Sequence, residues 1–185
     1  MKGSILRWSL ILAVVVALVM VSAPLAASPA AAATIRIPIE NYFVCCSKTE
    51  GTIWPSDDGL VHTRDRNYQA VVISNENYHT GRGQNWANAN IDPATGIGTY
   101  FGYMEIYPDA YDGWWAGHWV MQITESGAGG IARLQGYGEL RDLATKSELT
   151  PLPPSVLVNF ASLCGGNQPL AGTRAVGSVM DPGGE

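Results

Sequence analysis

The 185-residue sequence lacks the short motifs that mark the common catalytic and nucleotide-binding sites. G-x-S-x-G, which would place a hydrolase serine on a sharp strand-to-helix turn, does not occur. No G-x-G-x-x-G opens a helix, and there is no phosphate-binding loop. Helix signals of any kind are nearly absent. We therefore favour a non-enzymatic role and expect no bound nucleotide or other cofactor.

The chain also has little that could hold a metal ion. A metal site needs several His, Cys or carboxylate side chains that converge. The three histidines, His62, His79 and His118, are far apart and show no H-x-H or H-x-x-x-H spacing. His118 lies on the polar face of a predicted strand, where a solvated side chain is the usual outcome. We expect no metal site.

Carboxylates provide one candidate for acid–base chemistry. Glycoside hydrolysis needs two acids that flank a cleft, and Glu105, Glu125 and Glu139 lie on neighbouring predicted strands. Glu125 and Glu139 are expected at strand ends or on the outer face of the sheet. Glu105 lies among aromatic residues such as Tyr103, and burial there would raise its pKa and make it an acid or a base. Glu105 is the candidate catalytic residue, with a side chain that simply points to water as the alternative.

The N-terminus has the three parts of a secretory signal peptide. Two basic residues precede an apolar run over residues 10–21, and a small-residue tract then ends in three alanines before Thr34. The run is shorter than the roughly 20 apolar residues that a spanning helix needs. We predict a signal peptide over residues 1–33, cleaved after Ala33, with cleavage after Ala23 as an alternative. The mature protein would be extracytoplasmic and would keep no membrane anchor.

The charge of the chain is negative, with a formal net charge of −5 at pH 7. Removal of the leader takes away two basic residues and no acidic one, so residues 34–185 are more negative still. That length suits a single domain with one core. No basic patch is visible in the sequence, which argues against a nucleic-acid partner and against an anionic membrane surface.

Three cysteines remain after the leader, namely Cys45, Cys46 and Cys164. Export permits disulfides, and a bridge between the two adjacent cysteines would require a strained ring. We predict that Cys46 pairs with Cys164, with Cys45 as the alternative partner. A catalytic thiol is a less favoured interpretation, because no histidine pattern accompanies any of the three.

The remaining sequence is rich in strand signals, since aromatic and β-branched residues occur in short runs between glycines. Turn signals occur at residues 54–59 and 92–96. The prolines of residues 144–154 predict a loop. Residues 155–163 are largely apolar and show no clear strand or helix pattern. Strands are predicted over residues 34–40, 42–46, 60–66, 68–74, 84–89, 98–107, 113–125, 130–143 and 170–180. Three of these, over residues 98–143, are joined by short turns and predict an antiparallel meander.

Alternation assigns faces to the later strands. The inner face of residues 113–125 carries large apolar side chains, and Trp114 lies on the opposite face with His118. The predicted inner residues are Trp115, Trp119, Met121 and Ile123. Glycines recur on inner faces, at Gly117, Gly136 and Gly138. Small residues beside large aromatic ones suit the taper of a small closed barrel.

The segment from residue 96 to residue 143 resembles small exported bacterial proteins of the allene oxide cyclase-like and dirigent-like barrel group. The pattern combines a glycine-punctuated aromatic strand, a strand in which glycines alternate with tryptophans, and a strand that ends in G-x-G-x-L. The matching residues are Gly113, Trp114, Gly117, Trp119, Gly136, Gly138 and Leu140. The resemblance implies an all-β fold, a single antiparallel β-barrel of about eight strands of the calycin-like or allene oxide cyclase-like type. The resemblance does not identify a catalytic residue in this sequence.

Aromatic side chains are the remaining functional signal, because aromatic walls bind apolar ligands or stack on sugars. Our leading hypothesis is a secreted barrel that binds a small apolar or aromatic molecule without catalysis. The predicted ligand-binding residues are Tyr103, Glu105, Trp115 and Trp119. One alternative is a cyclase or isomerase in which Glu105 assists a substrate held by those walls. Another is a structural or surface-interaction protein whose aromatic residues fill a solid core.

Overall fold

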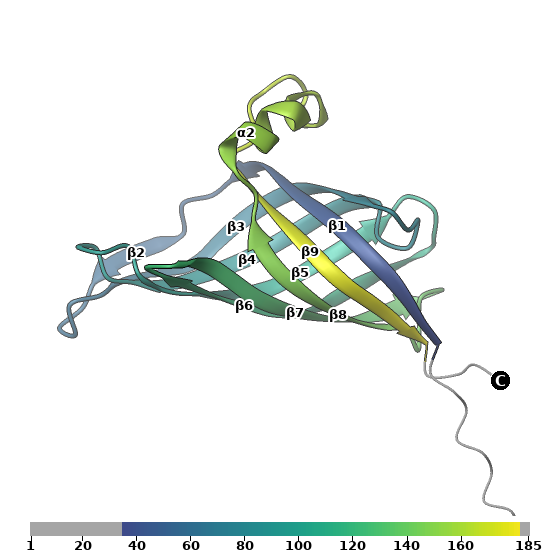
Figure 1. The fold of residues 1–185 in the computed structure, drawn as a ribbon, viewed down its shortest axis with the longest axis horizontal. Coiled ribbons are helices and arrows are strands. Elements are labelled where there is room, and N and C mark those ends of the chain that lie inside the picture. Colours follow the sequence, from purple (N-terminus) through teal and green to yellow (C-terminus); the bar gives the residue numbers. More distant parts are fainter. Residues whose placement is uncertain (1–34, 182–185) are drawn as a thin grey trace, which may run out of the picture. The chain divides into compact units, whose positions relative to one another are not determined.

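Strands make up most of residues 35–181, the part of the chain that the computed structural model describes (Figure 1). The strands are β1 (Ile35–Lys48), β2 (Thr52–Pro55), β3 (Val61–Ser74), β4 (Gly81–Ile91), β5 (Gly98–Pro108), β6 (Gly113–Thr124), β7 (Gly127–Gly138), β8 (Ala144–Pro151) and β9 (Ala171–Asp181). The predicted signal peptide and both of its cleavage positions lie outside the described residues.

Eight of these strands close into an antiparallel barrel, as the sequence predicts. β1 pairs with β9 along one side and with β3 along the other, and the remaining strands follow in chain order. The predicted meander is therefore confirmed as β5, β6 and β7. β2 is an additional short strand, which pairs with the first residues of β3 beyond the region where β3 meets β1.

Several predicted strands are longer than expected. The two strands predicted from residue 34 to residue 46 correspond to the single strand β1, which is described from Ile35. The strands predicted over residues 60–66 and 68–74 correspond to the single strand β3 (Val61–Ser74), which continues through a bulge between Thr63 and Arg66. A bulge adds one residue to a strand without ending it, so the apolar alternation changes phase inside β3. That change explains why its sequence predicts two strands.

The loop predicted over residues 144–154 is wrong for most of its length, because Ala144–Pro151 form strand β8. The strand alternates regularly, with Thr145, Ser147 and Leu149 buried and their neighbours exposed. Two of these three inward side chains are small and polar, so the alternation carries little hydrophobic signal. The prolines that predicted a loop begin only at the last residue of the strand, where the loss of a backbone donor costs little.

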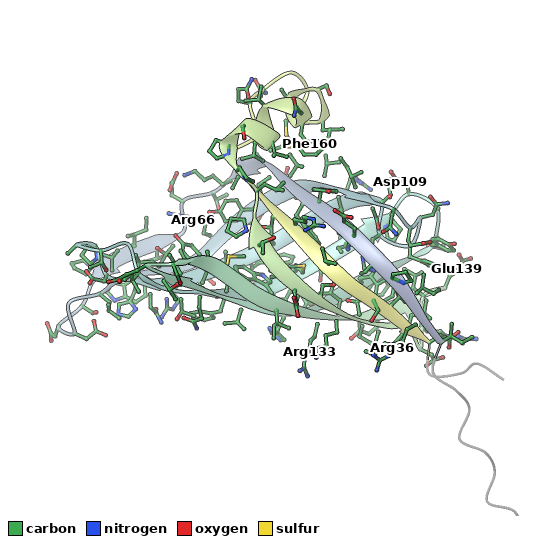
Figure 2. The ribbon with its side chains drawn as sticks, viewed as in Figure 1. Arg36, Arg66, Asp109, Arg133, Glu139 and Phe160 are labelled. Carbon is green, nitrogen blue, oxygen red and sulfur yellow. A yellow bond between two sulfur atoms is a disulfide. The ribbon has the colours of Figure 1, made fainter. Side chains whose placement is uncertain are left out.

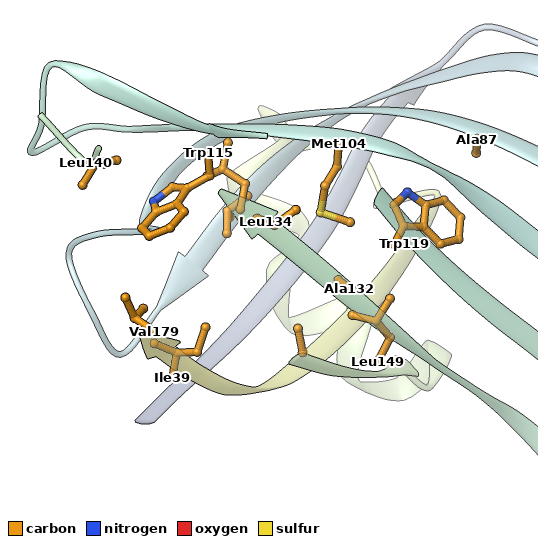
Figure 3. Close-up of a cluster of buried hydrophobic side chains, with 13 residues drawn as sticks. Ile39, Ala87, Met104, Trp115, Trp119, Ala132, Leu134, Leu140, Leu149 and Val179 are labelled. Atoms are coloured by element: carbon orange, nitrogen blue, oxygen red, sulfur yellow. The ribbon is translucent and has the colours of Figure 1, made fainter. Parts of the chain in front are cut away.

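The barrel interior is filled by the residues that alternation places there (Figure 3). Trp115 is fully buried and Trp119 is 8% exposed, whereas Trp114 on the opposite face is 40% exposed. Gly117 lies on the same inner face, where a Cβ atom would come within 2.0 Å of the Arg133 carbonyl oxygen of the next strand. The predicted faces of β6 are confirmed, and Gly117 is glycine because the adjacent backbone approaches closely.

A short helical segment lies outside the barrel and covers part of β1 (Figures 1 and 2). It consists of α2 (Pro154–Leu157) and the 3-10 helix η1 (Val158–Cys164). The Phe160 ring packs 5.8 Å from the Tyr42 ring of β1. Cys164 forms a disulfide with Cys46, which confirms the predicted pairing. Among residues 35–181, no helix is long and apolar enough to cross a bilayer.

The loop after β3 closes one end of the barrel with a buried histidine. His79 is completely buried, its Nδ1 atom lies 2.5 Å from the Asn41 amide nitrogen, and its ring meets the edge of Trp115 at 4.7 Å. These neighbours are uncharged, so nothing offsets the loss of water around a charged imidazole. Burial therefore lowers the pKa of His79 from 6.5 to about 4.

This depressed pKa makes stability depend on pH. The unfolded chain takes up a proton on His79 near pH 6.5, whereas the folded protein does so only near pH 4. The free energy of unfolding should therefore fall by about 3 kcal/mol as the pH drops from 7 to 4. Urea unfolding across this range measures the slope. The free energy of unfolding of His79→Gln should depend less on pH. An unchanged dependence in this variant would show that His79 is not the titrating group.

Candidate functional site

The four predicted ligand-binding residues lie on two faces of the barrel wall, although Glu105 and Trp119 both contribute to the lining of a small interior cavity. Trp115 and Trp119 point into the interior (Figure 3), while Tyr103 and Glu105 lie on the outer face of β5. In the register of the sheet, Ile106 is opposite Trp115, so the inward positions of β5 are the even-numbered ones. An interior site and an exterior site must therefore be considered separately.

Both interior tryptophans act as core residues with satisfied ring nitrogens. The Trp119 Nε1–H group donates to the Asn85 side-chain oxygen at 2.9 Å. The Trp115 Nε1–H group donates to the Tyr78 carbonyl oxygen at 2.7 Å. A buried indole N–H normally has such a partner. Neither group is left to contact a polar atom of a ligand.

The interior contains a small cavity. It has a volume of about 50 Å³ and its lining is mostly apolar, with Phe43, Met104, Trp119, Met121 and Leu149 among its residues. An apolar cavity of about 150 Å³ holds benzene, and one water needs about 10–15 Å³. The interior therefore has room for a few water-sized molecules, as expected of a nearly solid core.

A free thiol, that of Cys45, also lines this cavity. Burial raises the pKa of Cys45 to about 11 because a thiolate would be poorly solvated there. Since the thiolate is the reactive form, Cys45 is protonated and unreactive at neutral pH. The geometry fits a small core residue better than a nucleophile.

Glu105 lies outside the barrel and is half-buried between two tyrosines of its own strand. The Tyr107 hydroxyl donates to the Glu105 carboxylate, and this hydrogen bond raises the pKa of Tyr107 to about 12. Burial, followed by the nearby Glu105 charge, raises the pKa of Tyr103. The other two acids considered in the sequence lie in the turns at the two ends of β7, Glu125 before it and Glu139 after it. These two acids do not face each other across a cleft.

A groove lies on the outer surface close to Glu105. It has a volume of about 560 Å³ and lies between η1 and the outer face of β3, β4 and β5. Leu163 and the Cys46–Cys164 disulfide contribute to one side. The side chains on its floor are Gln69, Val71, Arg82, Gln84 and Tyr107. Ligand pockets commonly have volumes of about 300–1,000 Å³, so the groove has the size that the interior lacks.

The floor of this groove combines apolar surface with a few polar groups. Gln69 is directly opposite Gln84 in the register, and Gln84 is opposite Glu105. Arg82 lies two residues from Gln84 on the same outer face. Tyr107 and Leu163 are 38% and 37% exposed, so their apolar surfaces are accessible. A small molecule with an aromatic face and one polar end would match this arrangement.

One further cluster, on the β2–β3 hairpin, was not recognisable in the sequence. The Ser56 hydroxyl lies 2.6 Å from His62 Nε2, and His62 Nδ1 lies 2.7 Å from the Asn90 side-chain oxygen. This order of groups is that of a nucleophile, a base and an orienting group. Ser56 also donates to Asp58, and its hydroxyl lies 3.2 Å from the Leu60 carbonyl oxygen. Because the single hydroxyl proton of Ser56 is directed to Asp58 and not to His62, the cluster is better explained as a network that fixes the turn.

The histidines do not converge in the structure. His62 is on β3, His79 is in the loop that follows it, and His118 is exposed on the outer face of β6. Within residues 35–181, no group of three or more His, Cys, Asp or Glu side chains is placed to hold a metal ion.

Comparison of the chain with known protein families, with curated proteins and with solved structures found no match.

Proposed function

We propose that this protein is an extracytoplasmic binding protein that holds a small aromatic or amphipathic molecule in the outer groove, without catalysis. The observation that carries the proposal is the contrast between the two spaces. The groove has about 560 Å³ and accessible apolar side chains, whereas the interior has about 50 Å³. The signal-peptide pattern and the Cys46–Cys164 disulfide support a location outside the cytoplasm.

The placement of the acid gives less support to the cyclase or isomerase alternative. That mechanism needs Glu105 and the aromatic walls to face the same substrate. Glu105 lies on the outer face, and the buried tryptophans face the interior. A protein with a solid core and a binding surface is consistent with the same geometry, and the outer groove supplies such a surface.

Binding in the groove can be tested with 8-anilinonaphthalene-1-sulfonate, a fluorescent aromatic anion. Its rings suit Tyr107 and Leu163, and its sulfonate suits Arg82. We expect saturable binding that Tyr107→Ala weakens about tenfold, as for a central aromatic contact. The matched control is Trp114→Ala, which removes a similarly exposed ring on β6 that does not line the groove. Equal effects of both variants, or no saturable binding, would refute the proposal.

A further inference from the structure

A row of side chains crosses the outer face of the barrel from β4 to β8. Each member is directly opposite the next in the register of the sheet. The members, in order, are Trp86, Tyr103, His118, Arg133 and Lys146. We refer to these five residues as the outer row. Neighbouring strands are about 4.8 Å apart, so the outer row is about 19 Å long.

The second half of the outer row is positively charged although the whole chain is negative. Arg133 is directly opposite Lys146, and both are exposed. Like charges directly opposite each other destabilise a sheet. Within residues 35–181, neither side chain forms an ion pair, although Glu148 lies two residues from Lys146 on the same face. Two neighbouring cations on this face are therefore available to an anionic ligand.

The first half of the outer row is aromatic. The Trp86 and Tyr103 rings are 5.8 Å apart, and the Tyr103 ring meets the His118 ring at 5.3 Å. A shallow depression of about 690 Å³ lies over the charged half, where His118, Arg133 and Lys146 line it. Arg133 points away from the barrel in Figure 2, as a contact to an external molecule requires. Aromatic faces and cations thus lie along one line.

From this arrangement we infer that the outer row binds an acidic polysaccharide, a chain of sugar rings that carry carboxylates. The rings would stack on Trp86 and Tyr103, and carboxylates would pair with Arg133 and Lys146. Arginine in particular binds a carboxylate through two parallel hydrogen bonds. The length of the row exceeds one sugar ring, so the site would take several linked rings. The site is separate from the groove and does not depend on a ligand there.

Two other anionic partners fit the row less well. A lipid bilayer would meet a shallow depression with its planar surface and would leave the rings at the far end of the row without ring partners. A nucleic acid would meet only two fully charged side chains on a chain of net charge −5, whereas such interfaces are strongly basic. The acidic polysaccharide matches both halves of the row.

The test uses polygalacturonate, with hydroxyethylcellulose as the neutral comparison, in affinity electrophoresis of the mature protein. We expect retardation by polygalacturonate only, and weaker retardation as salt rises, because exposed charges are screened. The double variant Arg133→Gln/Lys146→Gln should bind about tenfold more weakly. Trp86→Ala should lose binding to polygalacturonate although the net charge of the protein is unchanged.

The charge-matched control is Lys48→Gln/Arg141→Gln, which removes two exposed cations outside the row. It should bind within about twofold of the unmodified protein, since a distant charge acts only through a screened field. An equal loss in this control would mean that net charge alone causes retardation and would overturn the inference. So would equal retardation by hydroxyethylcellulose. Binding to phosphatidylglycerol vesicles without binding to polygalacturonate would overturn it in favour of a lipid surface.

Discussion

Replacing Trp119 with alanine should lower the free energy of unfolding by about 3–5 kcal/mol, a large part of the roughly 5–15 kcal/mol that stabilises a domain of this size. The ring is 8% exposed and lies against Gly102, where a Cβ atom would be only 3.1 Å from it. Its loss would enlarge the interior cavity that it already lines and would remove the partner of Asn85. Strands closed into a barrel have little freedom to collapse into that space. Urea or thermal unfolding measures the loss.

Trp114→Ala is the control for this experiment, since it removes the same side chain from the opposite face of the same strand. Trp114 is 40% exposed and stacks on Tyr137 at 5.3 Å. Only that stack and part of the burial are lost, so we expect a decrease of about 1 kcal/mol. Equal and small losses in both variants would show that Trp119 is not a core residue.

The fold was predictable wherever alternation coincides with hydrophobicity. β6 is the best case, because large apolar residues occupy most of its inward positions from Trp115 to Ile123, while polar residues such as His118 and Gln122 lie on the outer face. β8 was missed because the inward positions 145 and 147 are Thr and Ser, which fit a narrow interior through their size but read as polar. β3 was divided in two because a bulge changes the phase of its alternation. Sequence patterns therefore identify strands less well where the inward residues are small and polar, or where a bulge shifts the register between two strands.

The candidate site was less predictable, because faces on different strands are related only through register. β5 has large apolar residues at both parities, with Met104 and Ile106 on one face and Tyr103 and Tyr107 on the other. Alternation alone cannot tell which set faces Trp115. The outer row was invisible for the same reason, since its members lie on five strands and become neighbours only once the register is known. The disulfide was predictable because few cysteines left few pairings.

Removal of the disulfide should have a similarly large effect. The Cys46–Cys164 bridge closes a loop of 118 residues, which contains most of the barrel. In the chain-entropy account, a bridge over such a loop contributes about 4–5 kcal/mol by restricting the unfolded chain. The bridge also holds η1 against β1, where the Tyr42–Phe160 contact is a single ring pair. Cys46→Ser/Cys164→Ser should therefore lower the free energy of unfolding by that amount and make residues 154–164 sensitive to proteolysis.

The two consequences can be separated, and each has its own measurement. Denaturant unfolding reports the global loss, and limited proteolysis under native conditions reports release of the helical segment. Because Leu163 and Cys164 line the groove, binding of 8-anilinonaphthalene-1-sulfonate should weaken in the same variant. Cys45→Ala is the control, since Cys45 lines the interior cavity and keeps a free thiol. If Cys45→Ala released residues 154–164 to proteolysis as the double variant does, Cys45 would be the bridging residue.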